Sequence, residues 1–167
     1  MQLLDFLTNF IPTTKASPSY YFAYGSNMLR ERLEERVEKV DYIGRAVLSD
    51  YAVSFSKLGS DGSGKATIVK RDGEIVEGAI FSLTENQLRM LDRFEGYPKH
   101  YIREELVVFQ EEDQRSFKAT TYIACLDHVK EGLLPTKEYL DFILQGAQQI
   151  NARRTYSKFE NSGTLLK

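Results

Sequence analysis

Residues 20–28 join an aromatic strand to a glycine turn and then to a charged helix. The aromatic side chains predict a buried strand, because flat rings pack well on a pleated surface. Gly25 lets the backbone turn where a Cβ would clash, and Ser26 or Asn27 can cap the helix that follows. A strand, a glycine turn and a helix N-terminus together present backbone N–H groups, which can bind a phosphate or a carboxylate.

The composition fits one ordinary domain, because 42% of the 167 residues are apolar, enough for a core. The net charge of −2 argues against nucleic acid as a partner, since phosphate binding needs a basic surface. No apolar run approaches the roughly 18 residues of a membrane-spanning helix. Residues 1–19 predict an extra amphipathic helix or a loosely held arm rather than a secretory signal. The single cysteine, Cys125, excludes an internal disulfide and a cysteine zinc site and fits a cytoplasmic protein.

Most of the chain has the pattern of β-strands. Enrichment in β-branched and aromatic residues predicts strands at 40–48, 51–55, 66–69 and 75–83. The Asp-Gly pair within residues 71–74 predicts a hairpin turn between the last two of these strands. Three glycines within residues 56–65 predict a mobile loop. A second, longer hairpin is expected from residues 101–109 and 117–126.

Three helices are expected between these strands. The first runs from Asn27 to about residue 39, and the second starts at a capping box, Thr84 to Gln87, and ends at Gly96. The third begins near Pro135. Many strands with few helices predict an α+β domain, a curled mixed sheet or small β-barrel flanked by helices. We expect this domain at residues 20–150, between an N-terminal extension (1–19) and a C-terminal tail (151–167).

Glu95 is the last residue before the glycine that ends the second helix. The negative end of the helix dipole, worth roughly 0.3–1 kcal/mol, and desolvation by Phe94 and Tyr97 would both raise the pKa of its carboxyl. Arg93 and Arg103 would oppose that shift if they approach. A raised pKa suits a group that transfers protons near neutral pH. By itself, however, a glutamate at this position is more often a solvated surface residue.

Two motifs together resemble the γ-glutamylcyclotransferase family. The first is the turn in residues 21–27, and the second is Leu91-Asp92-x-x-Glu95-Gly96, which follows about seventy residues later. The turn is closer to the branch with Phe-Ala-Tyr-Gly-Ser-Asn than to the γ-glutamylamine branch, where Tyr-Gly-Thr-Leu is more usual. The resemblance covers about residues 20–150, and its further matches are Val76-x-Gly78-x-Ile80-Phe81, Tyr101, Tyr122, Pro135-x-x-x-Tyr139 and Gly146-Ala147.

The resemblance implies an intramolecular cyclisation. In this family the free α-amine of a γ-glutamyl group attacks its own γ-carbonyl, which releases 5-oxoproline and an amine or amino acid. Because nucleophile and electrophile belong to one molecule, correct folding of the substrate supplies roughly 7–11 kcal/mol. No serine or cysteine nucleophile, metal or cofactor is required. One carboxylate can take a proton from the amine and return one to the departing nitrogen, and the motif assigns this role to Glu95.

The resemblance also implies a substrate-binding site. The turn would hold the α-carboxylate through backbone N–H groups, and Gly25 would let the ligand approach the backbone closely. The residues expected to bind substrate are Tyr24, Gly25, Ser26, Asn27, Tyr101, Tyr122 and Tyr139. For each tyrosine the alternative is core packing with its hydroxyl satisfied locally, since the chain has ten tyrosines.

Other interpretations stay open at this point. The same fold can serve as a non-catalytic module that binds a metabolite or a partner protein, and Ser26 can be imagined as the nucleophile of an amide hydrolase. His100 and His128 have no motif, and Asp92 is expected to face solvent. The expected partner is a small γ-glutamyl compound, with neither nucleic acid nor membrane, and a homodimer is left open. The loops at 56–65, 97–100 and 127–134 would select the leaving group, which the sequence does not identify.

Overall fold

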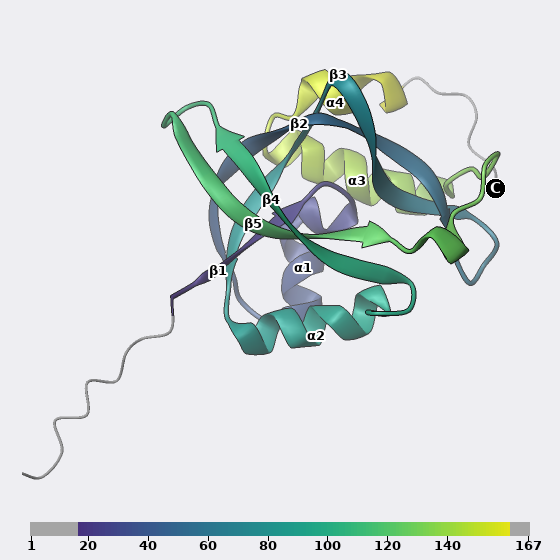
Figure 1. The fold of residues 1–167 in the computed structure, drawn as a ribbon, viewed down its shortest axis with the longest axis horizontal. Coiled ribbons are helices and arrows are strands. Elements are labelled where there is room, and N and C mark those ends of the chain that lie inside the picture. The colour runs from purple at the N-terminus through teal and green to yellow at the C-terminus, as the bar shows by residue number, and fades with distance from the viewer. Residues whose placement is uncertain (1–16, 161–167) are drawn as a thin grey trace, which may run out of the picture.

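The computed structural model describes residues 17–160, in which five strands close into a barrel with helices packed around it (Figure 1). The strands are β1 (Ser19–Ala23), β2 (Asp41–Leu58), β3 (Gly64–Leu83), β4 (Tyr101–Gln110) and β5 (Arg115–Ala124). The helices are α1 (Arg30–Val37), α2 (Glu85–Glu95), α3 (Lys137–Gln149) and α4 (Arg153–Glu160), with short 3₁₀ turns η1 (Ser26–Met28) and η2 (Leu126–His128). None of the helices within these residues is long and apolar enough to cross a membrane.

The barrel has the strand order β1-β3-β2-β4-β5. β1 pairs with β3 in antiparallel fashion and closes the barrel against β5 in parallel, at Tyr21 and Thr120. The mixed sheet forms because aromatic and branched side chains, Phe22, Ile80 and Phe81 among them, are fully buried inside it. The predicted α+β domain with a small barrel is therefore confirmed.

The long β2–β3 hairpin differs from the prediction. Each of its strands is continuous, and pairing runs to Leu58 and Gly64, so only residues 59–63 form the turn. The Asp-Gly pair does not make a hairpin; the predicted turn there is wrong. Gly73 has φ 80°, and its N–H donates to Asp50 Oδ1 (2.9 Å) where the register slips and the hairpin bends. The positive φ of Gly73 therefore allows β3 to bend within one continuous strand.

Local signals for α2 are confirmed, whereas those for α1 are not. Thr84 and Gln87 form the expected capping box, and Gly96 ends α2 with φ 65°. α1 begins only at Arg30, and its N-cap, Leu29, makes no side-chain hydrogen bond. The expected cap by Ser26 or Asn27 is wrong, because both residues lie in η1.

α3 packs directly against η1, and Gly146 makes this approach possible. A Cβ at Gly146 would lie 2.5 Å from the backbone nitrogen of Leu29 and 2.7 Å from Met28 Cβ. Only glycine fits at that distance. Figure 1 shows α3 beside α4 on one side of the barrel and α1 near α2 on another. α3 therefore holds the turn after β1 from behind.

α4 lies within the part of the chain that the sequence analysis assigns to a C-terminal tail. Its Tyr156 is 1% exposed, and the hydroxyl donates to the backbone oxygens of Glu77 (3.0 Å) and Tyr24. Glu77, also 1% exposed, accepts from Thr155 N (3.0 Å). Residues 151–160 thus pack on the barrel. The amphipathic helix or arm expected before β1 falls mostly on residues 1–16, which lie outside the described residues.

Candidate active site

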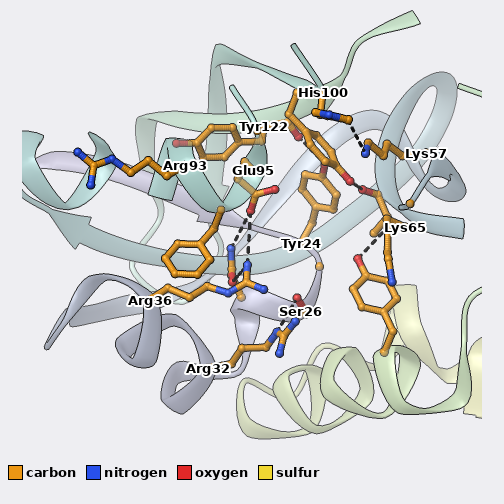
Figure 2. Close-up of a pocket in the computed structure, with 18 of the residues that line it drawn as sticks. Tyr24, Ser26, Arg32, Arg36, Lys57, Lys65, Arg93, Glu95, His100 and Tyr122 are labelled. Carbon is orange, nitrogen blue, oxygen red and sulfur yellow. Dashed lines mark hydrogen bonds and ion pairs between the residues drawn. The ribbon is translucent and has the colours of Figure 1, made fainter. Parts of the chain in front are cut away.

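A cavity of about 340 Å³ opens where the turn after β1, the end of α2 and the β2–β3 turn meet (Figure 2). This size is in the range of small-molecule sites. Every residue that the resemblance places in the site contributes to the wall: Tyr24, Gly25, Ser26, Asn27, Glu95, Tyr101, Tyr122 and Tyr139. Segments far apart in the sequence therefore share one cavity. The roles of these residues stay predictions.

Asn27 connects the turn to the carboxylate of Glu95. Its Nδ2 donates to Glu95 Oε1 and to the hydroxyl oxygen of Tyr21, each over 3.1 Å. Its Oδ1 accepts from Arg36 Nη1 (3.2 Å), and the same guanidinium nitrogen lies 4.0 Å from Glu95 Oε1. This network orients the carboxylate of Glu95 from two sides. The carboxylate accepts a hydrogen bond from the Asn27 amide, which Tyr21 and Arg36 hold in place.

Burial raises the pKa of Glu95, whose side chain is 16% exposed. Arg36, the hydrogen bond from Asn27, and the charge of Lys57 pull the pKa of Glu95 the other way, and the rise outweighs them. The direction matches the expectation from sequence. A carboxyl with a raised pKa is better matched to the pKa of an α-amine, about 7.7–8.0 in peptides, for exchanging protons.

Of the two neighbours expected to desolvate Glu95, Phe94 lines the cavity and Tyr97 does not. Phe94 is 57% exposed and Tyr97 is 42% exposed, and an arginine lies over each ring. The burial comes from the barrel side, because the carboxylate turns into the cavity. Gly96 ends α2 directly after Glu95, so the last turn of the helix, with Phe94 and Glu95, contributes to the cavity wall.

Asp92 does not face solvent, contrary to expectation. It accepts hydrogen bonds from Arg103 Nη2 (2.6 Å) and Nε (2.8 Å) and from the hydroxyl of Tyr122 (2.7 Å). Arg103 is therefore bound away from Glu95 and does not oppose its pKa shift. This pair attaches α2 to β4 and β5 and so fixes the helix end that carries Glu95.

The turn keeps its backbone donors free for a ligand. Within residues 17–160 no group accepts a hydrogen bond from the backbone N–H of Gly25, Ser26 or Asn27. Gly25 has φ −109°, and a Cβ there would lie 3.5 Å from the nearest protein atom outside its chain neighbours, Ala66 Cβ. The expected Cβ clash inside the protein is therefore wrong. The space that a side chain would fill belongs to the cavity.

Five tyrosines line the cavity, and burial raises the pKa of each, to about 12 for Tyr139. Their hydroxyls are therefore protonated at neutral pH. Tyr24 donates to the backbone oxygen of Tyr122, and Tyr101 donates to the oxygen of Ala66 (2.8 Å), so both shape the wall. The oxygen of Tyr139 instead accepts from Ala66 N (3.0 Å), which leaves the Tyr139 proton for a ligand.

A sequence profile of the family described as gamma-glutamyl cyclotransferase, AIG2-like, matches residues 21–141. The chain belongs to this family. Gamma-glutamylcyclotransferase from Bos taurus is 30% identical over 152 residues, which cover 85% of this chain and 77% of that protein. The Homo sapiens protein of the same name is 30% identical over 139 residues, covering 77% and 70%. A solved gamma-glutamyl cyclotransferase superposes with a TM-score of 0.78 at 25% identity, covering 90% of this chain and 94% of that one.

In this member of the family the cavity wall carries basic residues that were not expected at the site. They are Arg32 and Arg36 on α1, Lys57 and Lys65 on the β2–β3 hairpin, and His100 before β4. The four-residue spacing of Arg32 and Arg36 puts them on one face of α1, and that signal could have been used. Lys57 and His100 had none, because only the closed barrel brings them together.

Ser26 lacks the setting of a nucleophile in this family member. Its Oγ accepts from Arg32 Nε (3.0 Å), and within residues 17–160 no histidine or carboxylate hydrogen-bonds to it. A serine nucleophile needs an adjacent base. The described residues also contain no group of three or more His, Cys, Asp or Glu side chains that could hold a metal ion.

Proposed function

We propose that this protein converts a γ-glutamyl amide into 5-oxoproline and releases the amine or amino acid, with Glu95 as the general acid and base. The observation that carries the proposal is the hydrogen bond between Asn27 Nδ2 and Glu95 Oε1, 3.1 Å long, inside a cavity that also contains the turn. The family membership supports the same reaction class.

The turn would hold the glutamyl group by its α-carboxylate. The backbone N–H groups of Gly25, Ser26 and Asn27 are free donors, and Arg32 adds a positive charge beside Ser26. Because Glu95 sits one hydrogen bond from the same turn, an α-ammonium attached to a carboxylate bound there comes within reach of Glu95. The hydroxyl proton of Tyr139 is a further donor at this wall.

In this proposal one carboxylate, that of Glu95, carries out both proton transfers of the cyclisation. The α-ammonium first loses one proton to solvent, and Glu95 then takes a second proton from the resulting amine as its lone pair forms the new C–N bond to the γ-carbonyl carbon. Glu95 then gives a proton to the departing nitrogen as the old C–N bond breaks. A carboxylate in this role contributes about 10²–10⁴-fold to the rate. The folded substrate supplies the rest through its own effective molarity.

The alternatives predict different outcomes. A hydrolase would release free glutamate, but Ser26 bonds to an arginine and not to a base. A binding module would need the turn but no buried acid beside it. The raised pKa of Glu95 is an energetic cost that a pure binding site would have no reason to carry.

Product identification tests the proposal. The purified protein is incubated with γ-glutamyl dipeptides, and 5-oxoproline and glutamate are separated by mass spectrometry. We expect 5-oxoproline, and Glu95→Gln should lower kcat about 10²-fold or more while the fold is kept. Glu85→Gln makes the same change on the same helix at a side chain that is 55% exposed, and should keep full activity. Free glutamate as the product, or full turnover by Glu95→Gln, would refute the proposal.

A further inference from the structure

Lys57 is a buried cation on the wall of the cavity. The residue is 6% exposed and lies near the end of β2. The strand pairing is irregular there, because the four residues from Ser54 to Lys57 lie opposite only the three residues from Thr67 to Lys65 on β3. A bulge of this kind changes the direction in which the side chains of the strand point. Within residues 17–160 no carboxylate lies within ion-pair distance of its ammonium group. A buried charge without an anion is costly unless something compensates it.

The groups around Lys57 support the ammonium without neutralising it. Its Nζ lies 3.1 Å from His100 Nδ1, and 5.4 Å from the ring centroid of Tyr101. Burial and the charge of Lys57 lower the pKa of His100, so the imidazole is neutral at pH 7 and can accept from Lys57 through Nδ1. Burial likewise lowers the pKa of Lys57. The ammonium of Lys57 has three N–H donors and His100 accepts from one of them, so donors remain for an anion.

The charges of the cavity point to two anionic groups in its ligand. Among the described residues of the wall, Glu95 is the single acid, and Arg36 lies 4.0 Å from it. Lys65 pairs with Asp61 (3.4 Å), and Arg93 is exposed to solvent. Two partly or fully buried cations of the wall, Arg32 and Lys57, then have no carboxylate partner within residues 17–160.

These two cations lie on different walls. Arg32 comes from α1 beside Ser26, whereas Lys57 comes from β2 beside His100, and Figure 2 shows the Lys57 pair above the Arg32 pair, well separated from it. In a γ-glutamyl amino acid the two carboxylates likewise lie on either side of the scissile amide. A ligand whose α-carboxylate binds at the turn would thus point its leaving group toward Lys57.

We propose that Lys57, positioned by His100, binds the carboxylate of the released amino acid and makes this protein selective for γ-glutamyl-α-amino acids over γ-glutamylamines. This inference rests on the proposed function and names the leaving group for it. A charge-assisted hydrogen bond in a buried site discriminates strongly, because a neutral leaving group leaves the ammonium without its anion.

The test compares γ-glutamyl-alanine with γ-glutamyl-alaninamide, which differ only in the terminal carboxylate. In wild-type protein we expect kcat/KM to be about 10- to 100-fold higher for the acid. Lys57→Met should remove that preference by lowering kcat/KM for the acid alone, mainly through KM, and Lys57→Arg should restore part of it. Lys70→Met, at an exposed lysine on the same hairpin, is the matched control and should keep the preference.

Binding separates this inference from the proposed function. Titration calorimetry in the Glu95→Gln background measures the affinity for both ligands with and without Lys57→Met, and thermal melts verify folding. Tighter binding of the acid that depends on Lys57 supports the inference even if no turnover is found. Cyclisation without a preference for the acid, or an equal loss for both ligands in Lys57→Met, overturns the inference and leaves the proposed function standing. If neither ligand binds or reacts, both are overturned.

Discussion

The side-chain amide of Asn27 donates to Glu95 Oε1 over 3.1 Å and joins residues 68 positions apart in the chain. The same amide accepts from Arg36 through Oδ1, so one side chain coordinates the acid, the cation and the turn. Asn27 itself is 4% exposed and lies in η1, which α3 holds from behind. The position of the carboxylate is therefore set by packing around the turn as much as by α2.

Asn27→Ala tests how far this hydrogen bond tunes Glu95. The bond lowers the pKa of Glu95, so its loss should move the acidic limb of the pH profile of kcat/KM to higher pH. At a given pH on the acidic limb we expect activity to fall about 10-fold or more, since a hydrogen bond to a charged group is worth about 1.5–3 kcal/mol. Asn86→Ala, an exposed amide on α2, serves as control. An acidic limb that stays in place would contradict this role.

Gly25 and Gly146 should respond differently to alanine. At Gly25 a Cβ meets its nearest neighbour at 3.5 Å, so Gly25→Ala should keep the melting temperature but raise KM by blocking the turn. At Gly146 a Cβ would lie 2.5 Å from Leu29 N, so Gly146→Ala should destabilise the protein by about 1–3 kcal/mol. Urea unfolding and steady-state kinetics measure both variants. Equal loss of stability in the two would refute the difference.

Tyr156→Phe tests the attachment of α4. The hydroxyl donates to the backbone oxygens of Tyr24 and Glu77, and its removal leaves two buried carbonyls without this donor. We expect the free energy of unfolding to fall by about 1–3 kcal/mol. Tyr20→Phe is the control, because within residues 17–160 the Tyr20 hydroxyl has no hydrogen-bond partner while its ring packs on Phe117. A Tyr156→Phe protein as stable as its control would show that α4 is held by apolar packing alone.

Glu95→Gln should be more stable than the wild type at neutral pH. Burial raises the pKa of Glu95 above its ordinary 4.5, so the folded state holds that proton more tightly than the unfolded chain. The wild-type protein therefore loses stability as the pH rises from about 4.5 through the pKa of Glu95 in the folded state. The loss is about 1.4 kcal/mol for each unit by which the folded pKa exceeds the unfolded pKa. Glutamine has no proton to lose. Unfolding of both proteins between pH 4 and pH 8 should show a gap that opens with pH and closes below 4.5.

Local chemistry made several elements predictable. The capping box at Thr84 and the stop at Gly96 involve neighbours in sequence, and both are present. The Asp-Gly signal at Gly73 failed, because pairing of two long strands outweighed the preference of four residues for a turn. The cap expected from Asn27 failed for a related reason, since its amide makes contacts far along the chain.

The part of the site that lies within the two sequence motifs was predictable. The turn and Glu95 were found together through a family resemblance, and the structure places them around one cavity. Lys57 was not singled out and His100 was set aside for want of a motif, because the two residues belong to different elements and meet only when the barrel closes. Asp92 was misplaced for the same reason, as its partners Arg103 and Tyr122 come from β4 and β5.

The amino-acid sequence by itself determined the aromatic strand with the glycine turn after it, and the cap and the glycine stop of α2 beside Glu95, because each depends on conformational preferences of adjacent residues. The tertiary structure alone decided which charges are buried and which face one another. Burial and distance set the pKa of Glu95 and leave the ammonium of Lys57 without an anion, and both quantities arise only when remote segments pack together.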